Sequence, residues 1–479
     1  MTAENFDLLK EKLNGRVTDD PFETSFYTRD MASFPGFLVK LMFRVGAELA
    51  ARPQSEEDVR QLVAYARDNH MAITPRAGGT SAYMNAVPVS GGMVMDLTGL
   101  SGLIRLDKER GVAEVWCGTA WSALEKDLNR EGFTLCSYPS SAVSSTVGGW
   151  FSMEGQGIGS MAWGCFHDLV ESAHVILASG EEFDAAAAGP RPLSLFAGKE
   201  GTLAIVTRLT FKVVPLAEAV YHVSFAAPSA IVAAKIMDMA EKGPVKPFNG
   251  HFADRTCLDF QKRMGYEVPE VSGFLVTLSY RGAAADMAAC RAYAETIRLK
   301  TGVRLCSDET AAEEWEERLY SLRIKRNGPT LLAAEVILPM ARLNDFYGRV
   351  KKLRQRVSVY GHMMSGQQAN VMAQYYADES QTLRYLFYLA KTKKINDAAI
   401  ACGGRPYGTG VWNTVYLKRS RDPASLAEAR EAKERLDPEN RMNPGKFYRP
   451  PKLMPPALFG LACFAANLGS RVLRIGRRR

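Results

Sequence analysis

The chain has 479 residues, 47% of them hydrophobic and 23% charged, which excludes a disordered protein and leaves room for two or three hydrophobic cores. The formal net charge is +8, and five of the positive charges are arginines among the last nine residues, so the rest of the chain is nearly neutral and nucleic-acid binding is not indicated. The eight cysteines are scattered without a C-x-x-C pair, which argues against a zinc or iron–sulfur centre and favours reduced thiols.

The first 44 residues are interpreted as an N-terminal extension. They begin with the charged stretch MTAENFDLLKEKL and contain no apolar signal segment, so we expect a cytoplasmic protein. Residues 52–69 follow. Ser55 precedes acidic residues there, and Val59, Leu62 and Val63 recur at helical spacing, which predicts an N-capped helix.

Residues 75–81 read PRAGGTS and come directly after the apolar segment HMAIT. Two adjacent glycines allow left-handed backbone, and successive N–H groups in such a turn point into one concavity that binds anions. Arg76, Thr80 and Ser81 would add donors. The pattern indicates a cradle for a phosphate or pyrophosphate, and a plain Gly-Gly turn is the alternative.

The next segments predict strands over 91–97 and 112–117 and a helix over 121–131 that ends at Gly132. The Ser- and Gly-rich stretch 139–164 is interspersed with Trp150, Phe151 and Trp163, which favour an ordered, functional loop over disorder. A strand over 169–178 and a β-rich segment over 195–215 complete the first domain.

From residue 216 to about 400 the pattern changes. Short strands alternate with amphipathic helices, as over 230–242, 274–280 and 284–299, which predicts an α+β domain with an antiparallel sheet. The segment 401–448 is again rich in Gly and Pro and contains a helix over 423–435.

The tail, residues 455–479, is basic and amphipathic. One predicted helical face carries Leu458, Leu461, Ala462, Ala465, Leu468, Val472 and Ile475. The apolar run is shorter than the roughly 20 residues that a membrane span needs. We therefore expect peripheral contact with the inner face of a membrane or with a membrane-bound partner. Packing against the protein's own core is the alternative.

Four motifs occur in a fixed order. They are PRAGGTS, then PSSAVSSTVGGW with Trp163, Gly164 and Asp168 beyond it, then GKEGTLAIVTRLTFKVVP, and finally DPENRMNPGKFY. Together they resemble the FAD-linked oxidases of the vanillyl-alcohol oxidase class, and within them the glycolate oxidase and D-lactate dehydrogenase branch. The sequence has no G-x-G-x-x-G opening a helix and no G-x-x-x-x-G-K-[ST].

The resemblance, over residues 45–448, implies an α+β fold with a PCMH-type two-part FAD-binding domain (45–216). A cap domain with an antiparallel sheet and flanking helices (217–400) and a C-terminal return to the FAD site (401–450) would follow. The tail is 451–479. The resemblance also implies FAD contacts by Arg76, Ala77, Gly78, Gly79, Thr80, Ser81, Pro139, Ser140, Ser141, Thr146, Val147, Gly148, Gly149, Gly155, Gly157, Gly159, Ile205, Val206 and Asn443.

Three departures from the family pattern change these expectations. Thr80 stands where relatives with covalent flavin carry His, so we expect noncovalent FAD. Of the metal pattern H-x-G-D-G-N-x-H only His362 remains, so we expect no metal. Where the branch carries a catalytic His in E-H-G-I-G, this chain has Tyr407 between Pro406 and Gly408.

Four residues are candidates for catalysis. Tyr407 is a general acid or base, or an aromatic wall of the pocket. His362 is an alternative base or a structural residue. Arg323 and Arg326 precede the strand 335–339, and either they hold a substrate carboxylate or they form a solvated basic face. Cys165 and His167 are expected to pack near the flavin rather than to bind a metal.

The function expected from the resemblance is FAD-dependent oxidation of a hydroxyl-bearing carbon. The substrate would be small and anionic, such as a 2-hydroxy acid, and electrons would pass to a quinone or to an iron–sulfur or cytochrome partner. A sugar or polyol oxidase of the same class, a non-catalytic electron-relay FAD subunit and an alkylglycerone-phosphate synthase remain the alternatives.

Overall fold

The computed structural model describes residues 3–33, 39, 42–187, 191–353, 355–448, 461, 463, 465 and 466. The polypeptide forms two units that it visits alternately. Unit 1 comprises Met1–Gly155, Cys165–Pro215 and Gly408–Pro456, and unit 2 comprises Gln156–Gly164, Leu216–Tyr407 and Ala457–Arg479. Among the described residues, no helix has the length and apolar character needed to cross a bilayer.

Unit 1 begins with a four-stranded sheet in the order β1-β2-β4-β3, in which β2, β4 and β3 are parallel and β1 is antiparallel to β2. Helix α4 starts at the predicted N-cap Ser55, whose hydroxyl accepts the N–H of Asp58 at 3.1 Å. The elements of this part are α1 (Ala3–Lys12), β1 (Val17–Thr18), α2 (Pro21–Ser25), β2 (Leu49–Ala51), α4 (Glu56–Asp68), β3 (Ile73–Arg76) and β4 (Met93–Asp96).

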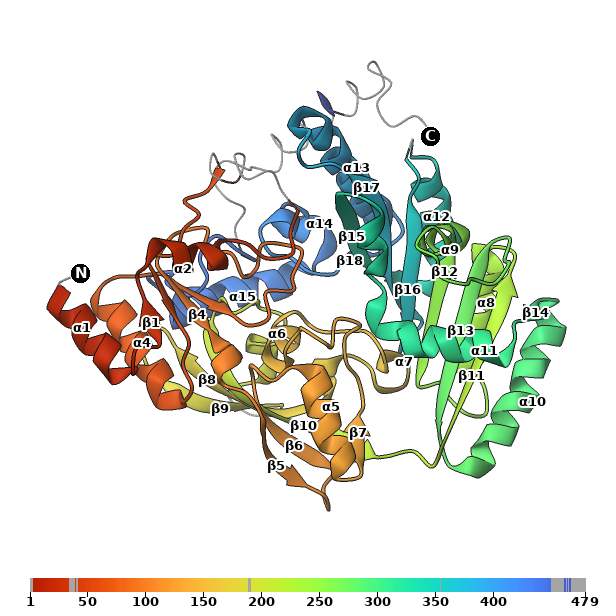
Figure 1. Cartoon of the computed structure of the whole chain (residues 1–479), viewed down its shortest axis with the longest axis horizontal. Helices are drawn as coiled ribbons and strands as arrows, with labels where there is room; N and C mark the ends of the chain where they lie inside the picture. The colour runs from red at the N-terminus through yellow and green to blue at the C-terminus, as the bar shows by residue number, and fades with distance from the viewer. Residues whose placement is uncertain are drawn as a thin grey trace. The chain divides into compact units, whose positions relative to one another are not determined.

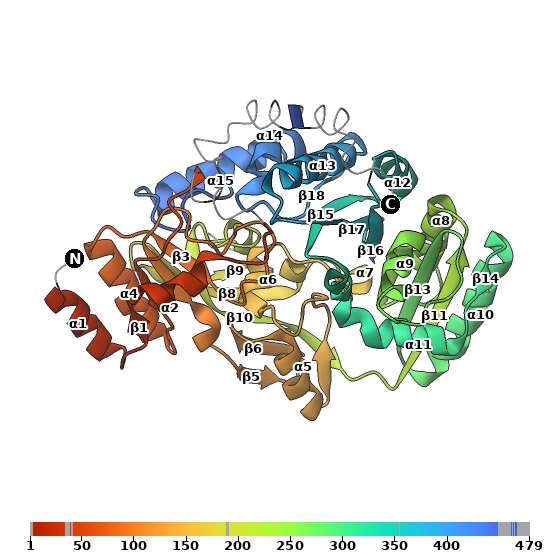
Figure 2. The same cartoon turned by 45° about the horizontal axis from the view of Figure 1, so that its top comes forward.

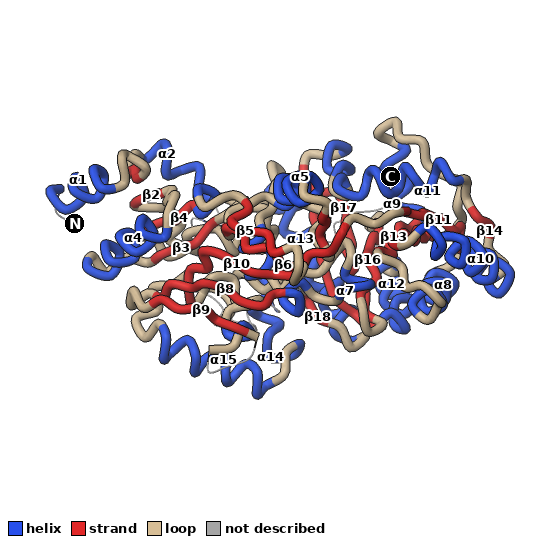
Figure 3. Tube along the Cα trace, turned by 90° about the horizontal axis from the view of Figure 1, so that it is seen from below, coloured by secondary structure: helices blue, strands red, loops and turns tan. Residues whose placement is uncertain are grey.

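The second sheet of unit 1 is antiparallel, in the order β5-β6-β10-β8-β9 (Figure 3). Strand β7 pairs with the end of β10. Its core contains the rings of Trp121, Trp150, Phe166 and Phe211, with neighbouring centroids 4.9–6.0 Å apart. The elements are β5 (Leu103–Asp107), β6 (Val112–Trp116), α5 (Trp121–Arg130), β7 (Phe133–Leu135), α6 (Val147–Ser152), β8 (Val170–Leu177), β9 (Glu182–Ala186) and β10 (Ala204–Pro215).

Unit 2 is built on an eight-stranded antiparallel sheet in the order β14-β11-β13-β12-β16-β17-β15-β18 (Figures 1 and 2), which confirms the predicted α+β class. Its strands are β11 (Ala219–Ala227), β12 (Asn249–Asp254), β13 (Phe274–Gly282), β14 (Arg304–Leu305), β15 (Thr330–Pro339), β16 (Ser358–Met364), β17 (Gln368–Ala377) and β18 (Arg405–Pro406). Its helices are α7 (Ser160–Trp163), α8 (Ala230–Glu241), α9 (Arg255–Lys262), α10 (Ala284–Thr301), α11 (Asp308–Glu316), α12 (Leu343–Lys351) and α13 (Thr382–Ala401).

The two faces of this sheet differ in character because side chains alternate along each strand. On β13, Val276 and Leu278 join a core that α8, α10, α12 and α13 cover. Thr277 and Ser279 lie on the opposite face, where α11 covers the β11 side of the sheet and α9 packs near β16. That polar face is the part of unit 2 that bears on function.

The C-terminal return of unit 1 consists of α14 (Leu417–Ser420), α15 (Pro423–Leu436) and the DPENRMNPGKFY motif. Asp437 accepts the N–H groups of Arg441 and Met442 at 2.9 and 2.8 Å. Lys433 forms an ion pair with Asp437 at 2.5 Å and donates to the carbonyl of Met442. Because Met442 forms a bridge with Ile73, this ion pair fixes the return against the start of β3.

We expect Asp437→Ala to destabilise unit 1 by about 3–5 kcal/mol, because it leaves the Lys433 ammonium buried without its anion and two buried N–H groups without an acceptor. The free energy of unfolding from denaturant titration measures the loss. Glu431→Ala, on the exposed side of the same helix α15, should stay within about 0.5 kcal/mol of wild type. An equal loss in both variants would contradict the role given to Asp437.

Candidate functional site

The glycine loop, residues 77–81, follows directly on β3 and is partly exposed. Gly79 has φ +60°, the left-handed backbone that the pattern predicted. Within the part of the protein that the structure describes, none of the five backbone N–H groups of this loop donates a hydrogen bond to the protein. A row of unsatisfied N–H groups beside a left-handed glycine is the geometry of an anion nest.

A second loop, residues 139–149, lies directly against the glycine loop. A Cβ added to Gly78 would come within 2.1 Å of the carbonyl oxygen of Ser144, so only glycine allows this approach. Gly149 lies close to Ala77, 3.9 Å from an added Cβ to the Ala77 methyl. Residues 140, 141 and 144 remain partly or fully exposed. The two loops thus form one continuous polar surface.

The Arg76 guanidinium lies against Gly79, where an added Cβ would come within 2.4 Å of Arg76 Nη2. The guanidinium donates to the carbonyls of Arg29 and Ala86 at 2.7 and 3.2 Å and lies over the ring of Tyr27. Burial lowers the pKa of this guanidinium from its ordinary value. Nη1 of this side chain therefore joins the N-terminal segment to the glycine loop, and the backbone N–H groups with the hydroxyls of Thr80 and Ser81 are the other donors at the loop.

Several of the predicted cofactor residues have a clear structural task. The Thr146 hydroxyl caps α6 by accepting the N–H of Gly149 at 3.2 Å. Added Cβ atoms would lie 2.6 Å from Cys117 at Gly148 and 2.3 Å from the Trp150 indole at Gly155. Pro139 and Val147 are buried. These residues fix the conformation of the loop 139–149, in which Ser140 and Ser141 are partly exposed.

Gly157 and Gly159 belong to unit 2, where they form the turn before α7. The N–H of Gly157 donates to Ser160 Oγ at 2.9 Å, and Gly159 has φ +85°. Ile205 and Val206 are buried in β10, where they pair with β8. The ladder between β10 and β6 begins only at Arg208, so the backbone of Ile205 and Val206 is paired as a strand on its β8 side alone.

Asn443 lies at the centre of a buried polar network in unit 1. It has φ +42°, its N–H donates to Ile73, and its side-chain amide donates to the carbonyls of Asn85 and Glu200 at 3.1 and 2.7 Å. Its amide oxygen accepts a hydrogen bond from the ammonium group of Lys446. The carboxylate of Glu200 accepts the N–H groups of Thr409 and Gly410, each at 2.8 Å.

Three ionisable groups of this network have shifted pKa values, and sequence reasoning did not single them out. Burial raises the pKa of Glu200 to about 7, although the two N–H donors oppose the shift. Burial lowers the pKa of Lys446 to about 7, opposed by Asp30 and Glu200. Burial also raises the pKa of Asp30 to about 6. The network therefore changes its charge near neutral pH.

In unit 2, Tyr407 follows β18 and is 8% exposed. Its phenol oxygen accepts the N–H of Gln156 at 3.3 Å, and its own N–H donates to the carbonyl of Glu335 at 3.0 Å. Tyr407 thus continues the ladder between β15 and β18, and it lies opposite Glu335.

His362 lies on β16 with both ring nitrogens engaged. One contacts the Tyr360 hydroxyl at 3.1 Å and the other the Asn249 amide oxygen at 3.3 Å. Since the amide oxygen can only accept, Nδ1 donates to it and Nε2 accepts from Tyr360. Burial lowers the pKa of His362 to about 3. A neutral imidazole whose lone pair is already used suits a structural role better than that of a base.

The predicted anion-binding arginines differ in their surroundings. Arg323 forms an ion pair with Glu317, lies 4.0 Å over the Tyr266 ring, and keeps only 9% of its side chain exposed. Arg326, three residues later in the 3₁₀ turn Arg323–Asn327, is exposed. A substrate anion at Arg323 would have to compete with Glu317.

The polar face of the unit 2 sheet carries a row that motif reasoning missed. Ser224, Thr277, His251, His362 and Asn370 are opposite one another on five consecutive strands. The signal for it in the sequence is the alternation of polar with apolar residues along each strand, but the register that aligns the five residues is set by pairing between distant segments. His251 also contacts Glu314 of α11 at 3.0 Å.

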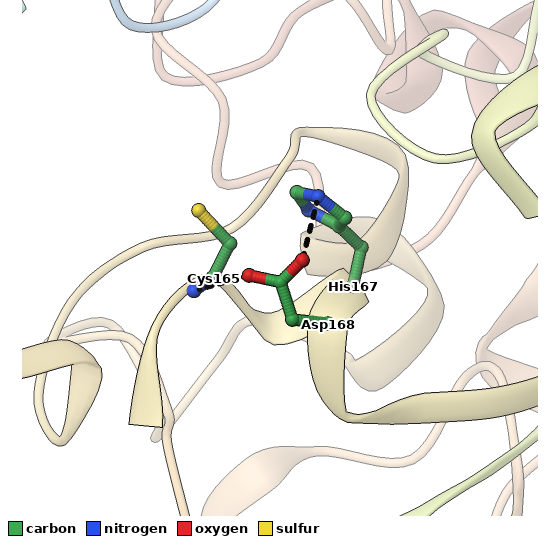
Figure 4. Close-up of side chains that lie close together, drawn as sticks. All are labelled: Cys165, His167 and Asp168. Carbon is green, nitrogen blue, oxygen red and sulfur yellow. Dashed lines mark hydrogen bonds and ion pairs between the residues drawn. The ribbon is translucent and has the colours of Figure 1, made fainter. Parts of the chain in front are cut away.

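Cys165, His167 and Asp168 form a cluster in unit 1 (Figure 4). One potential ligand atom from each lies within 4.8 Å of the others, and His167 Nε2 is 3.3 Å from an Asp168 oxygen. No fourth His, Cys, Asp or Glu joins them among the residues that the structure describes. Asp168 also accepts the N–H of Cys165, as the cap of the turn Phe166–Leu169. Cys165 and His167, expected in core packing near the flavin, are half-buried, whereas Phe166 between them enters the core.

Comparison with known proteins gives two family matches. The family described as FAD binding domain matches residues 47–186, and the one described as FAD linked oxidases, C-terminal domain, matches residues 214–447. D-lactate dehydrogenase of Anaerostipes hadrus is 24% identical over 93% of this chain and 98% of its own length. Glycolate oxidase subunit GlcD of Bacillus subtilis is 23% identical over 83% of this chain and 88% of its own.

The fold itself is shared with p-cresol methylhydroxylase, solved with its substrate bound. The TM-score is 0.78 at 15% sequence identity, over 94% of this chain and 98% of that one. At this identity the likeness concerns the fold alone.

The Lys446 network predicts a specific pH dependence of stability. Between the native pKa near 7 and the ordinary value of 10.5, the unfolded protein holds a proton that the native protein has lost, so raising the pH favours the native state. We expect the free energy of unfolding to rise from pH 7 to pH 10 by up to about 1.4 kcal/mol per unit more in wild type than in Lys446→Met. Parallel pH profiles for the two proteins would contradict the shift.

Proposed function

Because the chain belongs to the FAD-linked oxidases, and is therefore an FAD-dependent oxidoreductase, we propose that it oxidises a hydroxyl-bearing carbon of a small 2-hydroxy acid. FAD supplies the two-electron acceptor for such a reaction, and the protein supplies binding, orientation and electrostatics. The observation that carries the substrate assignment is the polar face of the unit 2 sheet. Relatives named D-lactate dehydrogenase and glycolate oxidase subunit support it.

The residues of unit 1 fit FAD. The five N–H groups of the glycine loop match the acceptor oxygens of a pyrophosphate, and the hydroxyls of Thr80 and Ser81 lie on the same loop. Ser140 and Ser141 extend this surface. A threonine at position 80 does not offer the imidazole that would bond covalently to a flavin, so we propose that FAD is held noncovalently.

On the substrate side, Tyr407 is proposed to contact the substrate. Its phenol oxygen accepts the Gln156 N–H, and an accepted hydrogen bond polarises the O–H and strengthens it as a donor. Glu335 stands opposite it on β15, and the Asn370 amide contacts the carboxylate of Glu335, and such groups suit a small hydroxylated molecule better than an aromatic ring. A neutral sugar or polyol fits the same donors and is the alternative substrate class.

The anionic group of the substrate is proposed to meet Arg326 or Arg323. Arg326 is exposed, and the guanidinium of Arg323 is paired with Glu317. Electrons are proposed to leave to a quinone or to an iron–sulfur or cytochrome protein. Neither assignment affects the geometry described above.

We also propose peripheral membrane contact through residues 455–479. Of this tail the structure describes Leu461, Cys463, Ala465 and Ala466, all in helical conformation. Leu461 is 64% exposed and Ala465 is exposed, whereas Cys463 is buried, so the described part of the predicted apolar face is uncovered. The rest of that face, including Leu458, Leu468, Val472 and Ile475, lies outside the described residues.

Gly78→Ala should weaken FAD binding by roughly tenfold or more, equivalent to about 1.4 kcal/mol. The added methyl meets the Ser144 carbonyl at 2.1 Å and must push apart the two loops that form the cofactor surface. Flavin titration of the apoprotein measures the effect. Gly46→Ala is the matched control because an added Cβ there has no neighbour within 4 Å. Equal affinities in the two variants would contradict the assignment.

The test of function is anaerobic reduction of the bound flavin. We expect glycolate, D-lactate or a larger 2-hydroxy acid of the D configuration to bleach the flavin absorbance, and we expect acid precipitation to release all of the chromophore. Bleaching by glycerol or a sugar alone would favour the polyol alternative. Bleaching by none of these compounds would refute the proposed function, and colour retained in the precipitate would refute noncovalent binding.

Tyr407→Phe removes the phenol oxygen and keeps the ring. If the hydroxyl contacts the substrate, the rate of flavin reduction should fall about 10²-fold while flavin content and spectrum stay unchanged. A near-normal rate would leave Tyr407 as a wall of the pocket. Tyr293→Phe, whose hydroxyl donates to the Met239 carbonyl on the helical side of unit 2, is the matched control.

A further inference from the structure

Oxidation of an alcohol carbon releases a proton as well as a hydride, and the candidate proton acceptors in this protein can be compared by their contacts. The His362 imidazole is neutral and uses its lone pair on Tyr360. An ordinary phenol has a pKa of about 10 and keeps its proton at neutral pH, so the Tyr407 hydroxyl is placed as a donor rather than as a proton acceptor. The residue that would receive the substrate's proton is therefore not among those that motif comparison indicated.

We propose that Glu335 is the catalytic residue that accepts the hydroxyl proton of the substrate. The inference rests on the proposed function and adds the proton acceptor to it. Glu335 lies on β15, in the polar face of the sheet, and it is half-buried while its neighbours in sequence, Ala334 and Val336, are buried in the core on the other face. It is thus the acidic residue that this strand presents to the polar face.

The neighbours of Glu335 hold its carboxylate in place. Asn370 Nδ2 donates to Glu335 Oε1 at 2.9 Å from the adjacent strand β17. The same amide group lies 3.5 Å from the Gln156 carbonyl, and the Gln156 N–H reaches the Tyr407 phenol. A single series of polar contacts therefore connects the carboxylate to the phenol through residues that are at most 8% exposed.

Glu335 and Tyr407 stand opposite each other on neighbouring strands. The register Val336 to Pro406 and the hydrogen bond from the Tyr407 N–H to the Glu335 carbonyl place the two residues as a cross-strand pair. Side chains in such a pair project from the same face with Cβ atoms about 5 Å apart. A carboxylate and a phenol at this separation can both reach one small hydroxy acid, the phenol as donor and the carboxylate as acceptor.

The chemical step balances with the cofactor of the family as oxidant. The C–H bond of the carbinol carbon breaks and its electron pair leaves as hydride to the oxidised flavin. The O–H bond breaks and its proton passes to Glu335, and the C–O single bond becomes a carbonyl. A carboxylate has about four acceptor positions, so it can accept from Asn370, from a second neighbour and from the substrate together. General-base assistance of this kind is worth about 10²–10⁴ in rate.

The experiment is stopped-flow reduction of the flavin in the loaded enzyme, with the hydroxy acid that bleaches wild type fastest. Glu335→Gln should lower the reduction rate constant at saturating substrate at least about 10²-fold without loss of bound flavin. The wild-type rate should fall at low pH as the carboxylate becomes protonated, and this acid limb should be absent from Glu335→Gln and present at a shifted pH in Glu335→Asp. Glu313→Gln, the same change at an exposed site of α11, should behave as wild type.

Three outcomes overturn the inference. They are an unchanged reduction rate in Glu335→Gln, a slower rate that keeps the acid limb, and loss of the acid limb in Glu314→Gln instead, which would assign the proton to His251 and its carboxylate partner. If Glu335→Gln fails to hold flavin, the pH profile of Glu335→Asp decides, since a shifted acid limb supports the inference and an unshifted one overturns it. Failure of wild type to react with any hydroxy acid is a distinct result, because it refutes the proposed function.

Discussion

The attachment of the C-terminal segment within unit 1 depends on one buried carboxylate, that of Glu200. Glu200 lies shortly before β10, and its two oxygens accept the N–H groups of Thr409 and Gly410 from the C-terminal return. An isolated carboxylate in an apolar interior is strongly disfavoured, and these donors together with the nearby Lys446 are what make its burial tolerable. These hydrogen bonds attach the segment after residue 408 to the part of unit 1 that precedes unit 2 in the sequence. Asn443 adds a second attachment by donating to the Glu200 carbonyl.

Polar contacts to backbone groups also fix the glycine loop, residues 77–81, in unit 1. Nη1 of Arg76 donates to the carbonyls of Arg29 and Ala86 and so fixes the start of the loop, whose N–H groups donate to no acceptor among the described residues. Close approach of Gly78 to the Ser144 carbonyl fixes it from the side. A rigid set of unpaired N–H groups loses little entropy when it binds an anion, which is the advantage of preorganisation.

Patterns among residues that are close in sequence predicted the helices and loops well. Ser55 and the acids after it are adjacent in sequence, and so are the glycines of the nest, so helix start and loop followed directly from spacing. The roles of Arg76 and Arg323 did not follow, because each guanidinium is already engaged, Arg323 by Glu317 and Arg76 by carbonyls of another segment. A basic residue in a binding motif is indistinguishable from a structural one until its partners are known.

Distance along the sequence explains the residues that were missed. Glu200 and Lys446 are both polar residues in recognisable motifs, yet only folding brings their segments together. The significance of Glu335 depends on register with β17 and β18, where a slip by one residue would exchange its place with a core residue.

The buried polar groups of the two units differ in charge. Unit 1 buries charged groups whose pKa values lie near neutrality, which suits a surface that must hold an anionic cofactor. The row of polar residues on the unit 2 sheet instead consists of imidazole, amide and hydroxyl groups, and the low pKa of His362 keeps that imidazole uncharged. The Asn370 amide of this row donates to the Glu335 carboxylate and positions it without removing its negative charge. Of the family's metal pattern only His362 remains in the sequence, and the face instead carries a row of neutral side chains that holds one acidic residue in position.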